Sequence, residues 1–128
     1  MVSGTVDVTT DMQAPNGNNA IDMSGSSPGT LSQGISFGSN VYKACFLTFQ
    51  LSGNPDTQGV YALRASIGDK TQDFTYVSNG NTRTNMKYVL AGFEFLPGDN
   101  SRTLTLQSLN EGSRGPMIDN VVVSRSCL

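Results

Sequence analysis

The residues of this chain that are able to do chemistry are few, and histidine is absent from the sequence. Without imidazole the chain lacks the commonest general base and the commonest protein ligand of transition metals. No histidine is present to activate a serine or cysteine nucleophile. Three carboxylates, Asp22, Asp56 and Glu94, could in principle pair to attack a glycosidic bond, but nothing in their spacing recommends it. We therefore expect a binding protein rather than an enzyme.

The most informative ionisable residue is Asp119, which lies beside Asn120 inside an apolar run at residues 117–123. A Gly-Pro pair precedes this run, and its β-branched residues predict a strand. A carboxylate in a buried strand must be hydrogen-bonded, paired or bound to a metal. Two roles are open for Asp119: a ligand of calcium, which prefers oxygen donors, or a structural carboxylate that accepts hydrogen bonds from loop amides. Asp22 has a similar context, and there the structural role is favoured.

Cys45 and Cys127 are the only two cysteines. A disulfide between them would close a loop of about 80 residues and stabilise the fold by about 4 kcal/mol in the chain-entropy model. Strand parity favours this pairing, because each cysteine shares the parity of apolar neighbours. The alternative is one buried thiol and one loose terminal thiol, and the geometry decides between them.

Length and composition indicate one secreted β-domain that spans residues 1–128. Charged residues make up 14% of the chain, whereas about 25% is typical. Glycine, serine, threonine and asparagine are abundant, as expected for a protein with many turns. A net charge of −2 without a basic cluster argues against nucleic acid. No run reaches the roughly 18 apolar residues of a membrane helix, and no signal peptide remains, so we interpret Met1 as the start of a mature or expressed fragment.

Extended segments alternate with turn signals along the whole chain, and no segment has a helical period. The expected strands are residues 4–10, 20–23, 30–37, 41–51, 59–67, 71–77, 86–96, 101–109 and the closing apolar run. In the strand at 41–51 we expect Cys45, Leu47, Phe49 and Leu51 to face inward. About nine short strands at regular spacing predict an all-β fold, an antiparallel jelly-roll β-sandwich.

Five motifs occur in an order that is specific as a set. They are AIDM (20–23) with GSSPG (25–29), FQLSGNP (49–55), RTNM (83–86), TLTLQSL (103–109) and GPMIDNV (115–121). Over residues 4–124 the chain resembles the bacterial extracellular choice-of-anchor C domains and the related plant cell-wall domains of galactose-binding-like fold. This resemblance implies a jelly-roll sandwich, outside the cell or on its surface, in a superfamily rich in carbohydrate-binding modules.

The chain departs from the pattern of these relatives at two points. Related domains begin with a strand of the type Asn-Gly-x-Phe-Glu beside the closing strand, and this chain starts at the segment that normally follows it. They also often carry a tryptophan after the Asn-Met element, where this chain has Lys87 and Tyr88 and no tryptophan anywhere. The resemblance implies a calcium site at Asp119. The first departure weakens this inference, because groups from the missing first strand would supply the other calcium ligands. The second departure weakens the inference that a sugar ring stacks on an aromatic side chain at this position.

A sugar site requires a flat aromatic face and planar polar side chains for the hydroxyl groups. Residues of these types have outward parity on the long strands: Tyr42, Phe46, Gln50, Arg64 and Tyr88. Others lie in the loops at one end of the sandwich: Asn54, Asp56, Asn81, Arg83, Asn85 and Arg114. The alternative is that the strand residues are ordinary half-buried side chains and the loop residues are turn formers.

We expect a non-catalytic extracellular adhesion or carbohydrate-binding module that acts on polysaccharide at a cell surface or cell wall, with no nucleic acid and no membrane insertion. The alternative is a self-assembling structural subunit of an extracellular fibre, sheath or matrix. A sandwich without its first strand leaves an edge open, and an extended segment of another chain can pair there to form a homo-oligomer or polymer. Residues 4–10 can also fill that place, or the sequence is a shortened fragment.

Overall fold

The computed structural model of the chain describes residues 1–10, 12–15, 19–38, 43–98 and 101–125. In these residues there are ten strands and no helix. The strands are β1 (Val2–Ser3), β2 (Asp7–Thr9), β3 (Ala20–Asp22), β4 (Thr30–Ser36), β5 (Cys45–Gly53), β6 (Gly59–Ile67), β7 (Lys70–Ser78), β8 (Val89–Phe95), β9 (Ser101–Ser108) and β10 (Pro116–Arg125).

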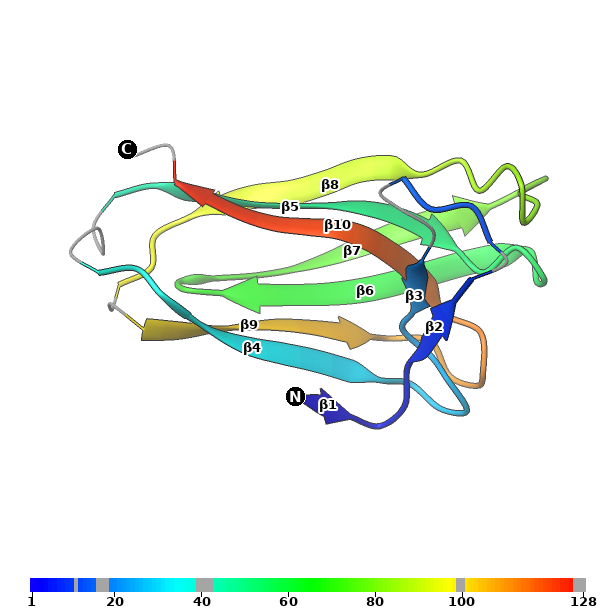
Figure 1. Cartoon of the computed structure of the whole chain (residues 1–128), viewed down its shortest axis with the longest axis horizontal. Coiled ribbons are helices and arrows are strands. Elements are labelled where there is room, and N and C mark those ends of the chain that lie inside the picture. The colour runs from blue at the N-terminus through cyan, green and yellow to red at the C-terminus, as the bar shows by residue number, and fades with distance from the viewer. Residues whose placement is uncertain (11, 16–18, 39–42, 99–100, 126–128) are drawn as a thin grey trace.

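The strands form two five-stranded antiparallel sheets. The first has the order β1-β4-β9-β6-β7, and the second has the order β2-β3-β10-β5-β8. Figure 1 shows the two layers, with β5, β8 and β10 along one side of the molecule and β4, β6 and β9 along the other. The prediction of an all-β jelly-roll sandwich is confirmed.

The core lies between the sheets and follows the alternation of β5 and β6. The predicted inward set of β5 is buried, and so is every second residue of β6: Cys45, Leu47, Phe49 and Leu51 with Tyr61, Leu63, Ala65 and Ile67. Each large apolar side chain in this set contributes about 1.5–3 kcal/mol by leaving water. Phe49 and Phe74 add an edge-to-face contact at a centroid distance of 5.2 Å.

The single strand expected at residues 4–10 is wrong. Its residues are divided between β2 in the second sheet and the turn that follows β1 in the first sheet. Gly4 has a φ of 67°, and a Cβ at this position would meet the carbonyl oxygen of Pro28. The next residue, Thr5, accepts a hydrogen bond at its hydroxyl from the Ser27 N–H at 2.9 Å. The left-handed glycine and the anchored threonine bend the chain from one sheet to the other.

The place beside β10 is therefore filled only in part. Strand β3 pairs with β10 at Met117 and Ile118 alone. Strand β2 lies outside β3 and does not reach β10. Residues 4–10 thus do not replace the first strand of related domains along most of β10.

Asp119 does not lie in a buried apolar stripe as expected, because it follows the inward-facing Ile118 in regular register with β5 and so faces outward; a bulge follows between Asp119 and Val122. Asn120 has a φ of 52° at this bulge. Cross-strand pairing of Asp119 with Gln50 puts both side chains on the outer face of the sheet, where each is half-buried. The bulge takes Asn120 out of the inward alternation that Ile118 begins, and Val123 again packs against the core.

Candidate functional site

Of the two aspartates singled out in the sequence, Asp22 is buried and Asp119 is only half-buried. Asp22 is 2% exposed and accepts hydrogen bonds from the backbone N–H groups of Ser24 at 2.8 Å and Gly115 at 3.0 Å. The side-chain amide of Asn54 donates a third bond at 2.7 Å. Burial raises the pKa of Asp22 to about 6, although the three donors oppose this shift. Asp22 therefore caps loop amides, the structural role considered at first for both aspartates.

Three of the predicted sugar-binding residues meet in one depression of about 310 Å³. We call it the Tyr88 depression, and it is lined by Gln13, Pro15, Gln50, Asn85, Lys87 and Tyr88. Gln50 comes from β5, whereas Asn85 and Tyr88 come from the loop before β8. The chain reverses in this loop at Lys87, which has a φ of 53°, so strand β8 begins only at Val89 rather than near residue 86.

Gln13 holds the Tyr88 depression in shape. The Tyr88 hydroxyl donates to the carbonyl oxygen of Gln13 at 3.0 Å, and the Met86 N–H donates to the Gln13 side-chain oxygen at 2.8 Å. Desolvation and then the charge of Asp119 raise the pKa of Tyr88, so the phenol is neutral at physiological pH. The sequence interpretation missed Gln13, because its partners lie more than 70 residues away in the chain and no local pattern marks the contact.

A second, more polar depression of about 490 Å³ is lined in part by Arg83. Four of the predicted loop residues line it: Asn54, Asp56, Arg83 and Arg114. The Arg83 guanidinium donates two hydrogen bonds to the Asp56 carboxylate, at 3.0 and 2.6 Å, and this contact lowers the pKa of Asp56. The backbone joins the two depressions, since the Gln13 N–H donates to the Arg83 carbonyl oxygen at 2.6 Å.

Phe46 and Arg64, also predicted to bind sugar, lie away from the Tyr88 depression. Phe46 is half-buried on the outer face of the same sheet, about 13 Å along β5 from Gln50 at about 3.3 Å per residue. Arg64 lies on the outer face of the opposite sheet and forms an ion pair with Asp73 at 2.7 Å. Tyr42 lies outside the described residues. The long strands therefore do not bring these side chains onto one shared platform.

Asn81 has a structural role. It is 5% exposed, and its amide donates to the Met86 carbonyl oxygen at 2.7 Å and to the Tyr76 hydroxyl at 2.8 Å. The Tyr76 hydroxyl in turn donates to the Lys87 carbonyl oxygen at 2.6 Å. This network fixes the backbone immediately before Tyr88.

The sequence of residues 1–124 matches a protein family described as "Protein of unknown function (DUF642)". The chain belongs to the DUF642 family. It is also 32% identical over 127 residues to Halomucin of Haloquadratum walsbyi, which covers 97% of this chain. The chain spans only about 1% of the length of Halomucin.

Several solved structures similar to this DUF642 chain are carbohydrate-binding modules, and others are glycosidase chains. TmCBM61, solved in complex with β-1,4-galactotriose, has a TM-score of 0.69 and 18% identity over 98% of this chain and 88% of its own. A family 35 module from Clostridium thermocellum has a TM-score of 0.68 and 14% identity over 96% and 89% of the two chains. A family 35 module from Paenibacillus barcinonensis has a TM-score of 0.62 and 15% identity over 98% and 93%. At these identities the similarity shows a shared jelly-roll fold.

The disulfide and the calcium site of this DUF642 chain stay predictions. Cys45 is buried in β5 opposite Arg125, and Cys127 lies outside the described residues. Among the described residues no group of three or more acidic, histidine or cysteine side chains is placed to share a metal ion. Calcium takes six to eight oxygen ligands, so Asp119 would need several partners of other types.

The described residues also include no apolar helix of membrane-spanning length.

Proposed function

We propose that this DUF642 chain is a single non-catalytic domain, residues 1–128, that binds carbohydrate through the Tyr88 depression. The observation that carries the proposal is the set of side chains that meets there. One aromatic ring lies beside planar amides, which is the combination that recognises a sugar ring and its hydroxyl groups. The carbohydrate-binding modules that share the fold support the same class of ligand.

The amides of this depression have hydrogen-bonding capacity to spare. In the part of the chain that the structure describes, the side chains of Gln50 and Asn85 make no hydrogen bond, and the NH₂ group of Gln13 makes none. The Tyr88 ring, in contrast, is held by its hydroxyl bond to Gln13. A fixed ring beside unsatisfied amides is preorganised for a polar ligand, because little ordering remains to oppose binding.

The size of the depression favours a short stretch of glycan. Its volume of about 310 Å³ lies at the lower end of the range of ligand sites, about 300–1,000 Å³. Lys87 lines the depression, and Asp119, which pairs with Gln50 and whose charge acts on Tyr88, adds a charge of the opposite sign nearby. This mixture suits a neutral sugar better than a strongly anionic one.

Titration calorimetry with β-1,4-galactotriose, followed by an array of cell-wall polysaccharides with and without calcium, tests the proposal. Gln50→Ala should weaken binding about tenfold, the equivalent of about 1.4 kcal/mol. Tyr88→Phe keeps the ring and loses its anchor, so it should weaken binding less than Tyr88→Ala. The matched control is Gln107→Ala, since Gln107 is also a half-buried outward glutamine, but on β9 of the opposite sheet.

If none of the sugars tested binds, carbohydrate binding is refuted. Equal losses in Gln50→Ala and Gln107→Ala would refute the location. A gain in affinity with calcium that Asp119→Asn abolishes would add the metal site that the sequence predicts.

We further propose that the module acts outside the cell, in adhesion at a cell surface or wall. The low content of charged residues and the narrower resemblance to choice-of-anchor C domains support this location. A second candidate function is a self-assembling structural subunit of an extracellular fibre, sheath or matrix. One observation favours it: among the described residues β3 pairs with β10 only at Met117 and Ile118, and residues 122–125 pair with β5 alone.

A further inference from the structure

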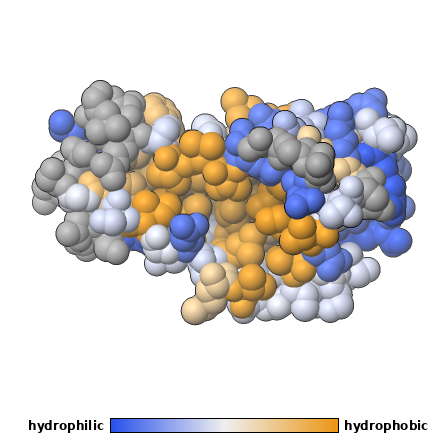
Figure 2. All heavy atoms as spheres, viewed as in Figure 1, coloured by the Kyte–Doolittle hydropathy of each residue, from blue (hydrophilic) through white to orange (hydrophobic). Residues whose placement is uncertain are grey.

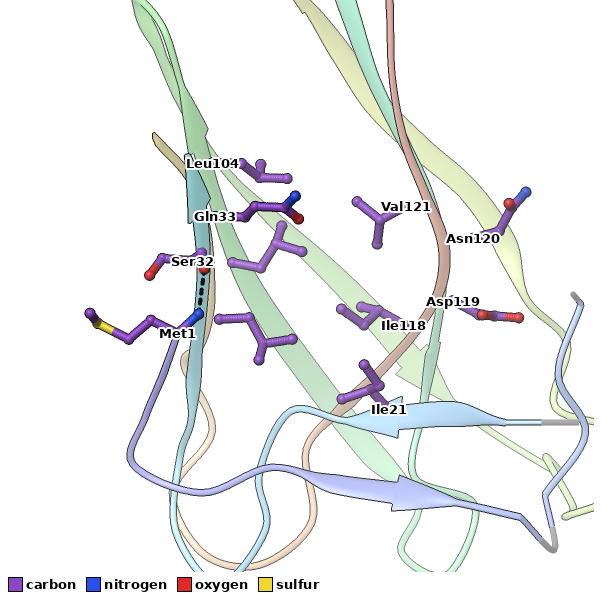
Figure 3. Close-up of a pocket in the computed structure, with 11 residues that line it drawn as sticks. Met1, Ile21, Ser32, Gln33, Leu104, Ile118, Asp119, Asn120 and Val121 are labelled. Carbon is purple, nitrogen blue, oxygen red and sulfur yellow. Dashed lines mark hydrogen bonds between the residues drawn. The ribbon is translucent and has the colours of Figure 1, made fainter. Parts of the chain in front are cut away.

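An apolar groove of about 400 Å³ opens between the two sheets on the side where β4 and β10 lie. We call it the edge groove. It is lined by Met1, Ile21, Leu31, Ser32, Gln33, Leu104, Leu106, Ile118, Asp119, Asn120 and Val121. Figure 2 shows apolar side chains gathered in a hollow at the middle of this face. In Figure 3, Ile21, Ile118 and Val121 point into the groove, whereas Asp119 and Asn120 point away from it.

Along part of this groove the described residues add no further strand to either sheet. Beyond Ile118 the described part of β10 pairs only with β5, so residues 121–124 form an outer edge of the second sheet. Beyond Leu31 the described part of β4 pairs with β9 alone, so residues 33–35 form an outer edge of the first sheet. The part of β4 that the N-terminal segment covers extends to Ser32, whose carbonyl oxygen accepts a hydrogen bond from the Met1 amino group at 2.8 Å (Figure 3).

These two edges lack the charged residues that normally prevent strands of different molecules from pairing. Residues 121–124 read Val-Val-Val-Ser, and residues 33–35 read Gln-Gly-Ile. Three of the four outermost strands do carry charged side chains: Lys70 and Asp73 on β7, Glu94 on β8 and Asp7 on β2; the two-residue strand β1 (Val2–Ser3) carries none. The bulge in β10 ends at Val122, so the strand that follows it is regular. The unprotected edges therefore coincide with the apolar groove.

We propose that the edge groove is a self-association surface on which a second copy of this chain docks, with its β10 antiparallel to β10 of the first. A two-fold axis at Val122 places Val122 opposite Val122 of the second copy and Val121 opposite Val123 of the second copy. The same surface then serves both copies, which closes a dimer.

A second copy is the occupant that the described surface favours. The register at Val122 sets no like charges opposite each other over residues 120–124, because none of these residues is charged. It also faces one apolar groove with another, so that Val121, which is 38% exposed, and the groove residues leave water together. The inference rests on the second candidate function, self-assembly at the β10 edge, and is independent of the Tyr88 depression.

Sedimentation or light scattering over a wide concentration range tests this dimer, and the informative variant is Val122→Lys. Val122 pairs with Thr48 on the outer face of the sheet and is 40% exposed, so lysine is compatible with the folded monomer. In the dimer the substitution brings two ammonium groups together at the two-fold axis, and we expect the dissociation constant to rise tenfold or more. The matched control is Val77→Lys, on the outer face of edge strand β7, where Val77 is 64% exposed. Circular dichroism shows whether each variant is folded.

We expect the wild-type chain and Val77→Lys to move from one to two copies as concentration rises, and Val122→Lys to stay at one. Gln33→Lys, at the rim formed by β4, should weaken the dimer as well. A wild-type chain that is monomeric at every concentration would overturn the proposal, whether or not the groove takes up an apolar dye. A wild-type polymer that grows beyond two copies would overturn the closed two-fold arrangement. Equal dimerisation of Val122→Lys and wild type would overturn the role of β10.

Discussion

The replacement of Asn81 by aspartate probes the network that holds the backbone before Tyr88. The Asn81 amide donates to the Met86 carbonyl oxygen, to the Tyr76 hydroxyl and, at 3.5 Å, to the Ser52 hydroxyl, and its oxygen accepts a bond from the Asn79 N–H at 3.3 Å. Aspartate has the same shape but no N–H group. In Asn81→Asp a buried carboxylate therefore faces a carbonyl oxygen where a donor stood, and that carbonyl loses one of its partners.

The expected loss follows from the burial of this site, which leaves Asn81 only 5% exposed. A buried polar group without a partner costs about 1–3 kcal/mol, and more when it is charged. We expect Asn81→Asp to lower the free energy of unfolding by about 3 kcal/mol at neutral pH. For a chain of 128 residues this lowers the melting temperature by about 12 °C, at about 4 °C per kcal/mol.

Acidification provides the decisive test of Asn81→Asp. Burial raises the pKa of the introduced carboxyl group in the folded state above its value in the unfolded chain, so the folded state binds the proton more tightly. The deficit relative to wild type should therefore shrink as the pH falls, and the protonated carboxyl can donate to Met86 again. Urea unfolding followed by circular dichroism at neutral and acidic pH measures this difference.

The matched control for this prediction is Asn79→Asp, because Asn79 lies exposed in the same loop. It should leave the unfolding midpoint almost unchanged at both pH values. Equal stability of the two variants at neutral pH would refute the buried network. A deficit in Asn81→Asp that is constant with pH would refute the claim that the introduced charge causes the loss.

Two further predictions concern single residues of the scaffold. The pKa of Asp22 rises from the ordinary 3.8 to about 6 in the folded chain. The free energy of unfolding of the wild-type chain should therefore increase as the pH falls from about 6 to about 4, by at most about 3 kcal/mol. Urea titrations should show that Asp22→Asn removes this gain, and an identical pH profile in both proteins would contradict the prediction. Gly92 has a φ of 156°, and a Cβ there would meet the Leu47 carbonyl oxygen. Gly92→Ala should therefore lower the free energy of unfolding by about 2 kcal/mol, measured by thermal unfolding. Gly34→Ala is the control and should change stability little, because a Cβ at Gly34 would meet open space.

Much of the fold follows from local patterns that were readable in the sequence. The alternation in β5 predicted its inward residues correctly, and the burial of β6 follows the same alternation, because successive side chains of a strand point to opposite faces. The same rule failed where a residue left the regular strand conformation. Gly4 and Asn120 have positive φ values, and each changes the direction of the residues next to it. Glycine at Gly4 was a visible signal, whereas the bulge at Asn120 depends on its pairing with β5 and had no local mark.

The candidate site shows the same division between local and long-range information. Residue types and strand parity were enough to select Gln50, Asn85 and Tyr88 as outward or loop residues. Parity gives the face of a strand but not the sheet to which the strand belongs, so Arg64 was grouped with Gln50 although the two lie on opposite sheets.

Local alternation thus determined that the chain forms a sandwich and which side chains enter its core, because burial depends on periods of two residues. Pairing between distant segments decided where the functional residues meet. Gln13 reaches Tyr88 across 75 positions of sequence, and Asp22 reaches Gly115 across 93. Such contacts depend on the order of the strands within each sheet, which no short stretch of residues specifies.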